Sequence, residues 1–215
     1  MNPPPKPELD FLQPASSPLT QSLGLGRMWE AIYAQLSAAE RGALGSVHVG
    51  AADRSDDFVP FAYTNQGEDR VNLTLELKPG QLELNLVGWK EAQSDAMKAW
   101  LQSVRGEDAI NDLEGYEVVA FAREAYKKTP ESAPWWQAES VVELGSCPAR
   151  EFNAGWVARR MIELPGSRKQ VKPAFHVRRS WPRESALQLD EGLVVELARE
   201  VRRLLPILRE IWARS

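Results

Sequence analysis

The chain has 215 residues, of which 43% are hydrophobic and 26% are charged, and its formal net charge is −4. This length supports one substantial core and a single domain by default, and the composition is ordinary for a soluble globular protein. With this net charge the molecule as a whole is not a generic binder of polyanions. No apolar run reaches the roughly 18 residues that span a bilayer.

Two further features favour the cytosol. The N-terminus from Met1 to Pro7 lacks the hydrophobic segment of a signal peptide, and Cys147 is the single cysteine, so no internal disulfide can form. The chain also carries eight tryptophans. Because a buried indole N–H usually needs a partner, we expect most of them at the edge of the core or in a binding groove.

The first third of the chain changes from proline-rich to periodic sequence. Residues 1–21 hold six prolines, which predicts a flexible arm ahead of a single domain over residues 22–215. Apolar residues at three- and four-residue steps then predict a helix over 23–36. Ser37 and Glu40 have the spacing of a capping box, so a second short helix is expected there.

The clearest pattern in the chain is a hairpin over residues 71–87. Leucines alternate with polar residues on both sides of Pro79-Gly80, which places one apolar and one polar row on each strand. Proline presets φ at the second turn position and glycine accepts a positive φ at the third, so we expect a type II turn. The apolar face formed by the leucines must be buried against other elements of the chain.

The remaining elements follow from the same periodicities. We expect strands over 46–51, 58–64, 116–122, 140–144, 156–164 and 171–181, and helices over 90–104 and 190–213. Asp190 has the character of an N-cap, and Pro206 predicts a kink or break in the closing helix.

This order of elements predicts the fold class. Tight turns join most of the strands and no βαβ alternation recurs, which favours a single α+β domain with a largely antiparallel sheet. Three helices, over 23–36, 90–104 and 190–213, would cover one face of that sheet.

Three segments carry a resemblance to a known family. They are Arg27-Met28 with Ala31-Ile32 in the leading helix, the Phe58–Val87 strands followed by Trp89, and Leu204-Leu205-Pro206-Ile207-Leu208 in the closing helix. Across most of residues 23–213 the chain resembles the YktB-like family of bacterial α+β proteins. The resemblance implies the same fold class and a bacterial origin. It carries no chemistry or site residue.

A basic tract with interleaved aromatic residues is the first candidate binding site. Residues 159–183 hold eight basic residues and one acidic residue, whereas residues 51–117 hold fourteen acidic and six basic residues. Arginine and lysine neutralise phosphates and aromatic rings stack on bases, so this mixture suits nucleic acid or an acidic protein partner. The residues expected to make contact are Arg160, Arg168, Lys169, Arg178, Arg179 and Trp181. The alternative is that the arginines of an exposed strand pair with the acidic half of the chain.

Two other patterns are candidates for function. Trp135 and Trp136 lie together in a proline-bounded loop, where one of the two is a candidate contact for a ligand or partner. Glu76 and Lys78 share a strand face downstream of Asp57, the pattern of a Mg²⁺-dependent nuclease, although any solvated hairpin also shows Glu and Lys two apart.

These patterns support three functional hypotheses. The first is a non-enzymatic binding module whose basic-aromatic hairpin over 156–183 contacts nucleic acid or an acidic partner. The second is the nuclease that uses Glu76 and Lys78, and the third is a structural subunit of a larger complex. His48 and His176 have no companions at metal-ligand spacing, so we expect no metal and no cofactor.

Overall fold

The computed structural model describes residues 9–14, 16–54, 57–67, 70–88, 90–124, 140–162 and 171–214. One sheet contains seven strands in the order β1-β2-β3-β4-β7-β5-β6, and every strand pair in it is antiparallel. The strands are β1 (Ser46–Arg54), β2 (Asp57–Asn65), β3 (Asn72–Lys78), β4 (Gln81–Val87), β5 (Glu117–Glu124), β6 (Ser140–Pro148) and β7 (Val171–Pro182). The predicted α+β class with a largely antiparallel sheet is confirmed.

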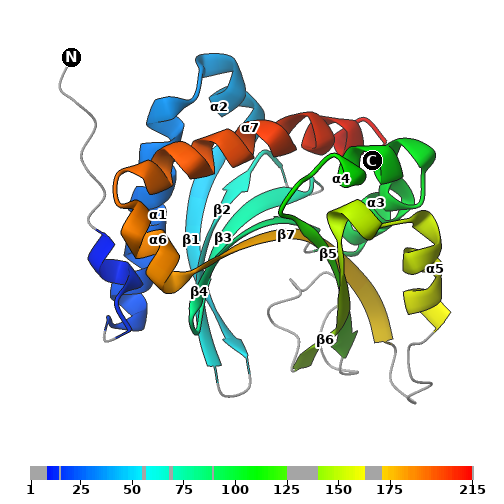
Figure 1. Ribbon diagram of the computed structural model, residues 1–215, viewed down its shortest axis with the longest axis horizontal. Helices are drawn as coiled ribbons and strands as arrows, with labels where there is room; N and C mark the ends of the chain where they lie inside the picture. The colour runs from blue at the N-terminus through cyan, green and yellow to red at the C-terminus, as the bar shows by residue number, and fades with distance from the viewer. Residues whose placement is uncertain are drawn as a thin grey trace.

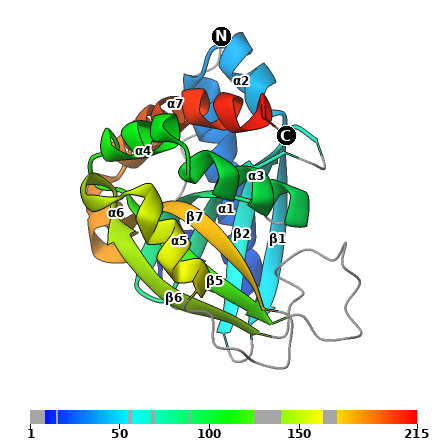
Figure 2. The same cartoon turned by 90° about the vertical axis from the view of Figure 1, so that its right-hand side faces the viewer.

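The described helices cover one side of this sheet. They are η1 (Leu9–Leu12), α1 (Pro18–Gln35), α2 (Ala38–Leu44), α3 (Glu91–Leu101), α4 (Val104–Asn111), η3 (Ala149–Glu151), α5 (Ala154–Ile162), α6 (Arg183–Leu189) and α7 (Gly192–Trp212). Figures 1 and 2 show the sheet as an arch, with α3, α4 and α7 above its outer side. We call the opposite side of the sheet, which faces into the arch, the inner face.

The predicted hairpin is confirmed and forms the middle of the sheet. Its six leucines, at positions 73, 75, 77, 82, 84 and 86, are buried in the main core. Gly80 has φ +82°, the value that the third position of a type II turn requires. The three predicted covering helices correspond to α1, α3 and α7, whose apolar side chains belong to the same core.

The start of the folded body lies earlier than the sequence predicted. Phe11 and Leu12 in η1 are buried, and Phe11 packs so closely on α1 that a Cβ at Gly24 would lie 2.1 Å from its ring. Ser17 caps α1 by accepting a hydrogen bond from the Thr20 amide. Residues 9–12 and 18–21 are therefore part of the folded body and not of a flexible arm, and residues 1–8 lie outside the described residues.

Helix capping explains two differences between prediction and structure. The expected helix over 90–104 is confirmed as α3 but ends at Leu101, and a separate helix, α4, follows because the Ser103 hydroxyl accepts from the Gly106 amide and caps it. The expected strand over 156–164 is wrong: α5 occupies this segment, and Asn153 accepts from the Trp156 amide at 3.1 Å. Trp156 and Val157 are buried on one side of α5, which is helical rather than strand periodicity.

The closing helix also differs in detail. Asp190 does not cap it: this residue has φ +47° in the turn between α6 and α7, and Glu191 holds the N-cap position. Pro206 does not break α7, which is continuous from Gly192 to Trp212. Pro206 and Arg202 are exposed, so water can satisfy the backbone carbonyl that proline leaves without a donor. The capping box of Ser37 and Glu40 at α2 is confirmed.

Candidate functional site

Two consecutive arginines of β7 point to opposite faces of the sheet. Side chains alternate along a strand, so Arg178 lies on the inner face and Arg179 lies on the helix-covered side. Each arginine enters a separate network of charged groups. These two networks are the main concentrations of described, partly buried charge.

Arg178 is surrounded by carboxylates. Its guanidinium donates to Glu117 at 2.8 Å and to Glu143 at 3.2 Å, and it lies 3.6 Å from a Glu83 oxygen. The Glu83 side chain is inaccessible to solvent, and its second oxygen lies 2.8 Å from the Lys78 ammonium. We call this set, Arg178 with Glu83, Glu117 and Glu143, the Arg178 network.

The carboxylates fix the charge of Arg178. Burial alone favours the neutral guanidine, but the hydrogen bond to Glu117 and the negative charges of Glu83 and Glu143 outweigh it and raise the pKa of Arg178. The arginine is therefore a permanent cation whose role in the fold is to compensate the buried Glu83 carboxylate and the partly exposed Glu117 and Glu143.

The residues of the nuclease hypothesis also lie on the inner face. Glu76 and Lys78 share this face, as alternation predicted, and Glu76 lies opposite Glu83 in the β3–β4 register. The Lys78 ammonium is held by Glu83. The backbone of Asp57 belongs to β2, but its side chain lies outside the description. Among the residues that the structure describes, no three Asp, Glu, His or Cys side chains are grouped to hold a metal ion.

Arg179 enters a network with the opposite arrangement. The fully buried Glu200 carboxylate of α7 receives Arg179 at 3.0 Å, Arg199 at 3.1 Å and Arg203 at 3.1 Å. Glu196 pairs with Arg179 at 3.0 Å and also with Arg199. We call these five residues the Glu200 cluster.

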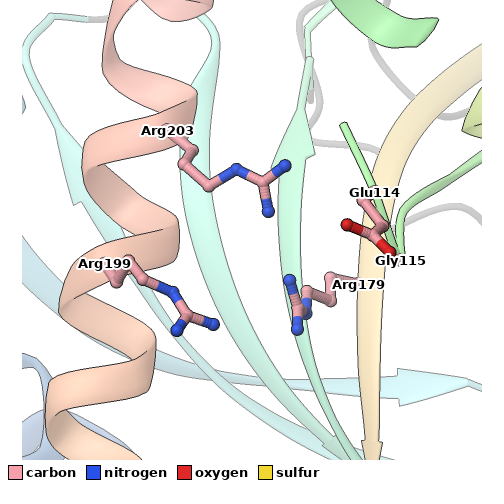
Figure 3. Close-up of a pocket in the computed structure, with 5 residues that line it drawn as sticks. All are labelled: Glu114, Gly115, Arg179, Arg199 and Arg203. Atoms are coloured by element: carbon pink, nitrogen blue, oxygen red, sulfur yellow. The ribbon is translucent and has the colours of Figure 1, made fainter. Parts of the chain in front are cut away.

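A pocket opens above the Glu200 cluster. It measures about 580 Å³ and is lined by Glu114, Gly115, Arg179, Arg199 and Arg203; we call it the arginine pocket. Figure 3 shows the guanidinium groups of Arg199 and Arg203, from α7, pointing toward that of Arg179 on β7. Gly115, with φ +80°, lies in the loop before β5 and next to the Arg179 guanidinium.

Two aromatic rings contact the arginines of the pocket. The Arg179 guanidinium lies 5.2 Å from the centre of the Trp181 ring and 5.7 Å from that of Tyr116, and Arg203 lies 5.8 Å from Tyr116. Burial, and then the Glu200 charge, raise the pKa of Tyr116 far above its ordinary value. The ring is therefore neutral and presents a π-face to two cations.

The predicted basic-aromatic hairpin is not assembled in the structure. Arg160 lies on α5, where it donates to the Leu144 carbonyl and covers Trp156 at 5.4 Å. Trp181 is buried, and Arg178 and Arg179 lie on opposite faces. For Arg178 the alternative prediction, pairing with the acidic half of the chain, describes the geometry. Arg168, Lys169, Trp135 and Trp136 lie outside the described residues.

The α7 members of the cluster were missed at the sequence level. Glu196, Arg199, Glu200 and Arg203 recur at three- and four-residue steps, which places them on one helix face. That spacing was a usable signal, but the apolar face of the same helix gives a stronger pattern. The position of Arg179 opposite this face could not be derived without the sheet topology.

Comparison with known proteins identifies no relative. No family model, no curated protein and no solved structure matches the chain. The resemblance to the YktB-like family therefore stays a prediction. In the part of the chain that the structure describes, no helix is long and apolar enough to cross a membrane.

Proposed function

We propose that the chain is a non-enzymatic binding module that receives an acidic segment of a protein partner in its arginine pocket. The observation that carries the proposal is the convergence of three guanidinium groups on one open pocket. Planar guanidinium groups bind carboxylates in a bidentate manner and remain charged at all physiological pH values.

The hydrogen-bond donors of the Glu200 cluster support an anionic ligand. Three arginines face two carboxylates, Glu196 and Glu200, and Glu114 on the pocket rim adds a third carboxylate, so the charges around the pocket balance. Each guanidinium has five N–H donors, more than its contacts within the cluster use. A carboxylate from a partner would take up the remaining donors.

The solvent exposure of the side chains in the Glu200 cluster also favours an anionic ligand at this pocket. The Arg199 side chain is 60% exposed and that of Arg203 is 31% exposed, whereas Glu200 is fully buried. The cations thus face solvent and the central anion does not. An incoming acidic group meets the guanidinium groups first.

A peptide fits this pocket better than a nucleic acid does. Nucleic-acid binding usually requires basic residues spread along a phosphate backbone, whereas these three arginines gather at one point of a chain with net charge −4. One helical turn before Arg199, Val195 is 60% exposed and offers an apolar contact beside the charged one. An acidic peptide with an apolar neighbour matches both features.

Fluorescence anisotropy with the full chain tests the proposal. The probes are a labelled peptide of Glu and Val residues and a labelled single-stranded oligonucleotide of equal charge. We expect the peptide to bind, and the double variant Arg199→Ala with Arg203→Ala to weaken it by about tenfold or more, because charge-assisted hydrogen bonds are lost. Arg209→Ala, an exposed arginine of α7 outside the pocket, is the matched control.

Three results would contradict the proposal. They are the absence of peptide binding, an equal effect of the pocket and control variants, and preferential binding of the oligonucleotide. Circular dichroism melting of each variant separates loss of binding from loss of folding. Glu114→Gln adds a gain-of-function arm: it removes a negative charge from the pocket rim, so it should strengthen peptide binding.

A further inference from the structure

The two outer strands of the sheet, β1 and β6, are protected differently. Figure 2 shows them at opposite ends of the sheet. Two features of β6 discourage a further strand. Its pairing with β5 shifts between Ala120 and Phe121, which marks a β-bulge at Leu144, and the Arg160 guanidinium donates to the Leu144 carbonyl at 3.2 Å. In contrast, β1 pairs with β2 over all of its nine residues without a register shift.

The backbone of β1 offers hydrogen-bonding groups at this edge. In an antiparallel pair, alternate residues of an edge strand direct their N–H and C=O groups away from the neighbouring strand. Within the described part of the chain, the backbone of β1 bonds to no backbone other than that of β2, and the Ser22 hydroxyl contacts the Gly50 carbonyl at 3.4 Å. The sequence from Leu44 to Ala52 contains no Asp, Glu, Lys, Arg or Pro. It therefore lacks the residues that usually keep a strand edge from pairing.

Exposed apolar side chains lie next to the same edge. Val49 of β1 points to the helix-covered side, where its side chain would lie 2.9 Å from a Cβ at Gly26 of α1. Leu19, Leu23 and Gly26 follow one another at steps of four and three residues, so they form one stripe of α1 beside Val49. Leu19 is 69% exposed, Leu23 49% and Val49 45%, and they are three of the six exposed large apolar side chains among the described residues. Apolar residues that gather in this way mark an interaction surface.

We propose that this edge is the interface of a homodimer, in which β1 pairs antiparallel with β1 of a second copy around a two-fold axis. The axis stands perpendicular to the sheet, so the sheet continues across the junction and the helix-covered sides of both copies lie on the same side. The outward backbone groups of the two strands then pair, and the apolar stripes of the two α1 helices meet above the junction. One symmetry operation covers both the backbone edge and the apolar surface.

The composition of β1 favours a second copy over a different partner. A strand that pairs with itself places its central side chains close to their own copies, so a charged group near the axis would face a like charge. The uncharged stretch from Leu44 to Ala52 avoids this repulsion. A second copy also brings β1 already extended with α1 beside it, whereas a disordered segment would lose conformational entropy on binding. The proposal goes beyond the recognition of acidic partners, because β1 and α1 contribute no residue to the arginine pocket.

Sedimentation equilibrium of the full chain over a range of concentrations tests the proposal. We expect a reversible dimer. Val49→Lys places a positive charge next to its own copy, and Leu23→Lys places one in the apolar stripe, so each should weaken the dimer by about tenfold. Val104→Lys is the matched control, since this valine is exposed in α4, which Figure 2 shows away from β1. The control should dimerise like the unmodified chain.

Amide hydrogen exchange at a low and a high protein concentration shows whether the strand itself forms the interface. The outward amides of an unpaired edge strand exchange readily, whereas amides bonded to a second strand are protected. We expect the amides of residues 46–50 that do not bond to β2 to exchange more slowly at the higher concentration. A dimer without this protection would be formed by another surface and would overturn the proposal.

Three further results would overturn the proposal. They are a monomer at every concentration, which would leave the edge to a strand of a different protein, a dimer unaffected by both lysine variants, and an equal loss in the Val104 control. Circular dichroism melting of each variant separates loss of pairing from loss of folding. The double variant of Arg199 and Arg203 should dimerise like the unmodified chain, so failure of one proposal leaves the other intact.

Discussion

The Arg178 network and the Glu200 cluster are built from the same residue types in inverted roles. In the first, one buried arginine is surrounded by three carboxylates; in the second, one buried carboxylate is surrounded by three arginines. Both centres are withdrawn from solvent, so the surrounding groups set the charge offered to a ligand. The first network therefore offers negative charge and the second positive charge.

Strand alternation produces this inversion from adjacent residues. Arg178 and Arg179 are neighbours in β7, yet a period of two sends them to opposite faces. Their sequence environment is the same, and only their partners on other elements differ. The composition of a segment is therefore a poor guide to the charge it presents.

The largest expected effect is the loss of the central cation of the Arg178 network. Arg178→Met leaves the buried Glu83 with Lys78 as its remaining cation, and we expect it to lower the free energy of unfolding by about 3 kcal/mol. Urea denaturation measures this change. Arg199→Met, at a side chain 60% exposed, should cost clearly less, because solvent screens exposed ion pairs. Equal losses would mean that the two networks do not differ in burial as described.

Removal of the central anion of the Glu200 cluster should have a smaller cost and a functional gain. Glu200→Gln keeps the shape of the side chain while the partly exposed arginines remain solvated, so we expect a loss of about 1–2 kcal/mol. The freed guanidinium groups should bind the acidic peptide more tightly in the anisotropy assay. Weaker binding by Glu200→Gln would contradict the view that Glu200 and the ligand compete for the arginines.

Thr74→Val should stabilise the folded protein. The hydroxyl has no partner, so its replacement by a methyl group should raise the free energy of unfolding by up to about 1 kcal/mol, whereas Thr64→Val should lower it by a similar amount. Chemical denaturation measures both. A loss in both variants would mean that Thr74 is satisfied in solution.

The smallest effect at neutral pH concerns two tyrosines, Tyr116 beside the Glu200 cluster and Tyr63 in β2. Burial and the Glu200 charge raise the pKa of Tyr116, and burial raises the pKa of Tyr63. Unfolded tyrosine ionises near pH 10, whereas the folded protein keeps the neutral form. The contribution of each tyrosine to the free energy of unfolding is therefore present below about pH 10 and is lost as pH rises further. Denaturation from neutral pH to about pH 11 should show that loss reduced more by Tyr116→Phe than by Tyr63→Phe. The reverse order would contradict the stronger burial of Tyr116.

Local rules predicted the fold where the pattern was strong. The leucine alternation of the hairpin and the box of Ser37 and Glu40 each specify local structure through two or three nearby residues, and both are confirmed. The strand prediction for the segment of α5 was wrong because the arginines interrupt its apolar spacing. The helix start is set by Asn153, which accepts from the Trp156 amide.

The candidate site was less accessible from sequence. Arg178, Arg179 and Trp181 were identified as notable residues, but the partners that determine their roles are distant along the chain. Glu83 meets Arg178 because β4 pairs with β7, and Glu200 meets Arg179 because α7 crosses the sheet. Such pairings are properties of the topology, which residue spacing does not encode.

Side-chain NMR of the arginine Nε–Hε groups gives the sharpest test of the arginine pocket. In a titration of the full chain with the acidic peptide, we predict saturable shifts for Arg199 and Arg203 and none for Arg209. Uniform small shifts of all three signals, or shifts confined to Arg209, would contradict recognition of an acidic group in this pocket.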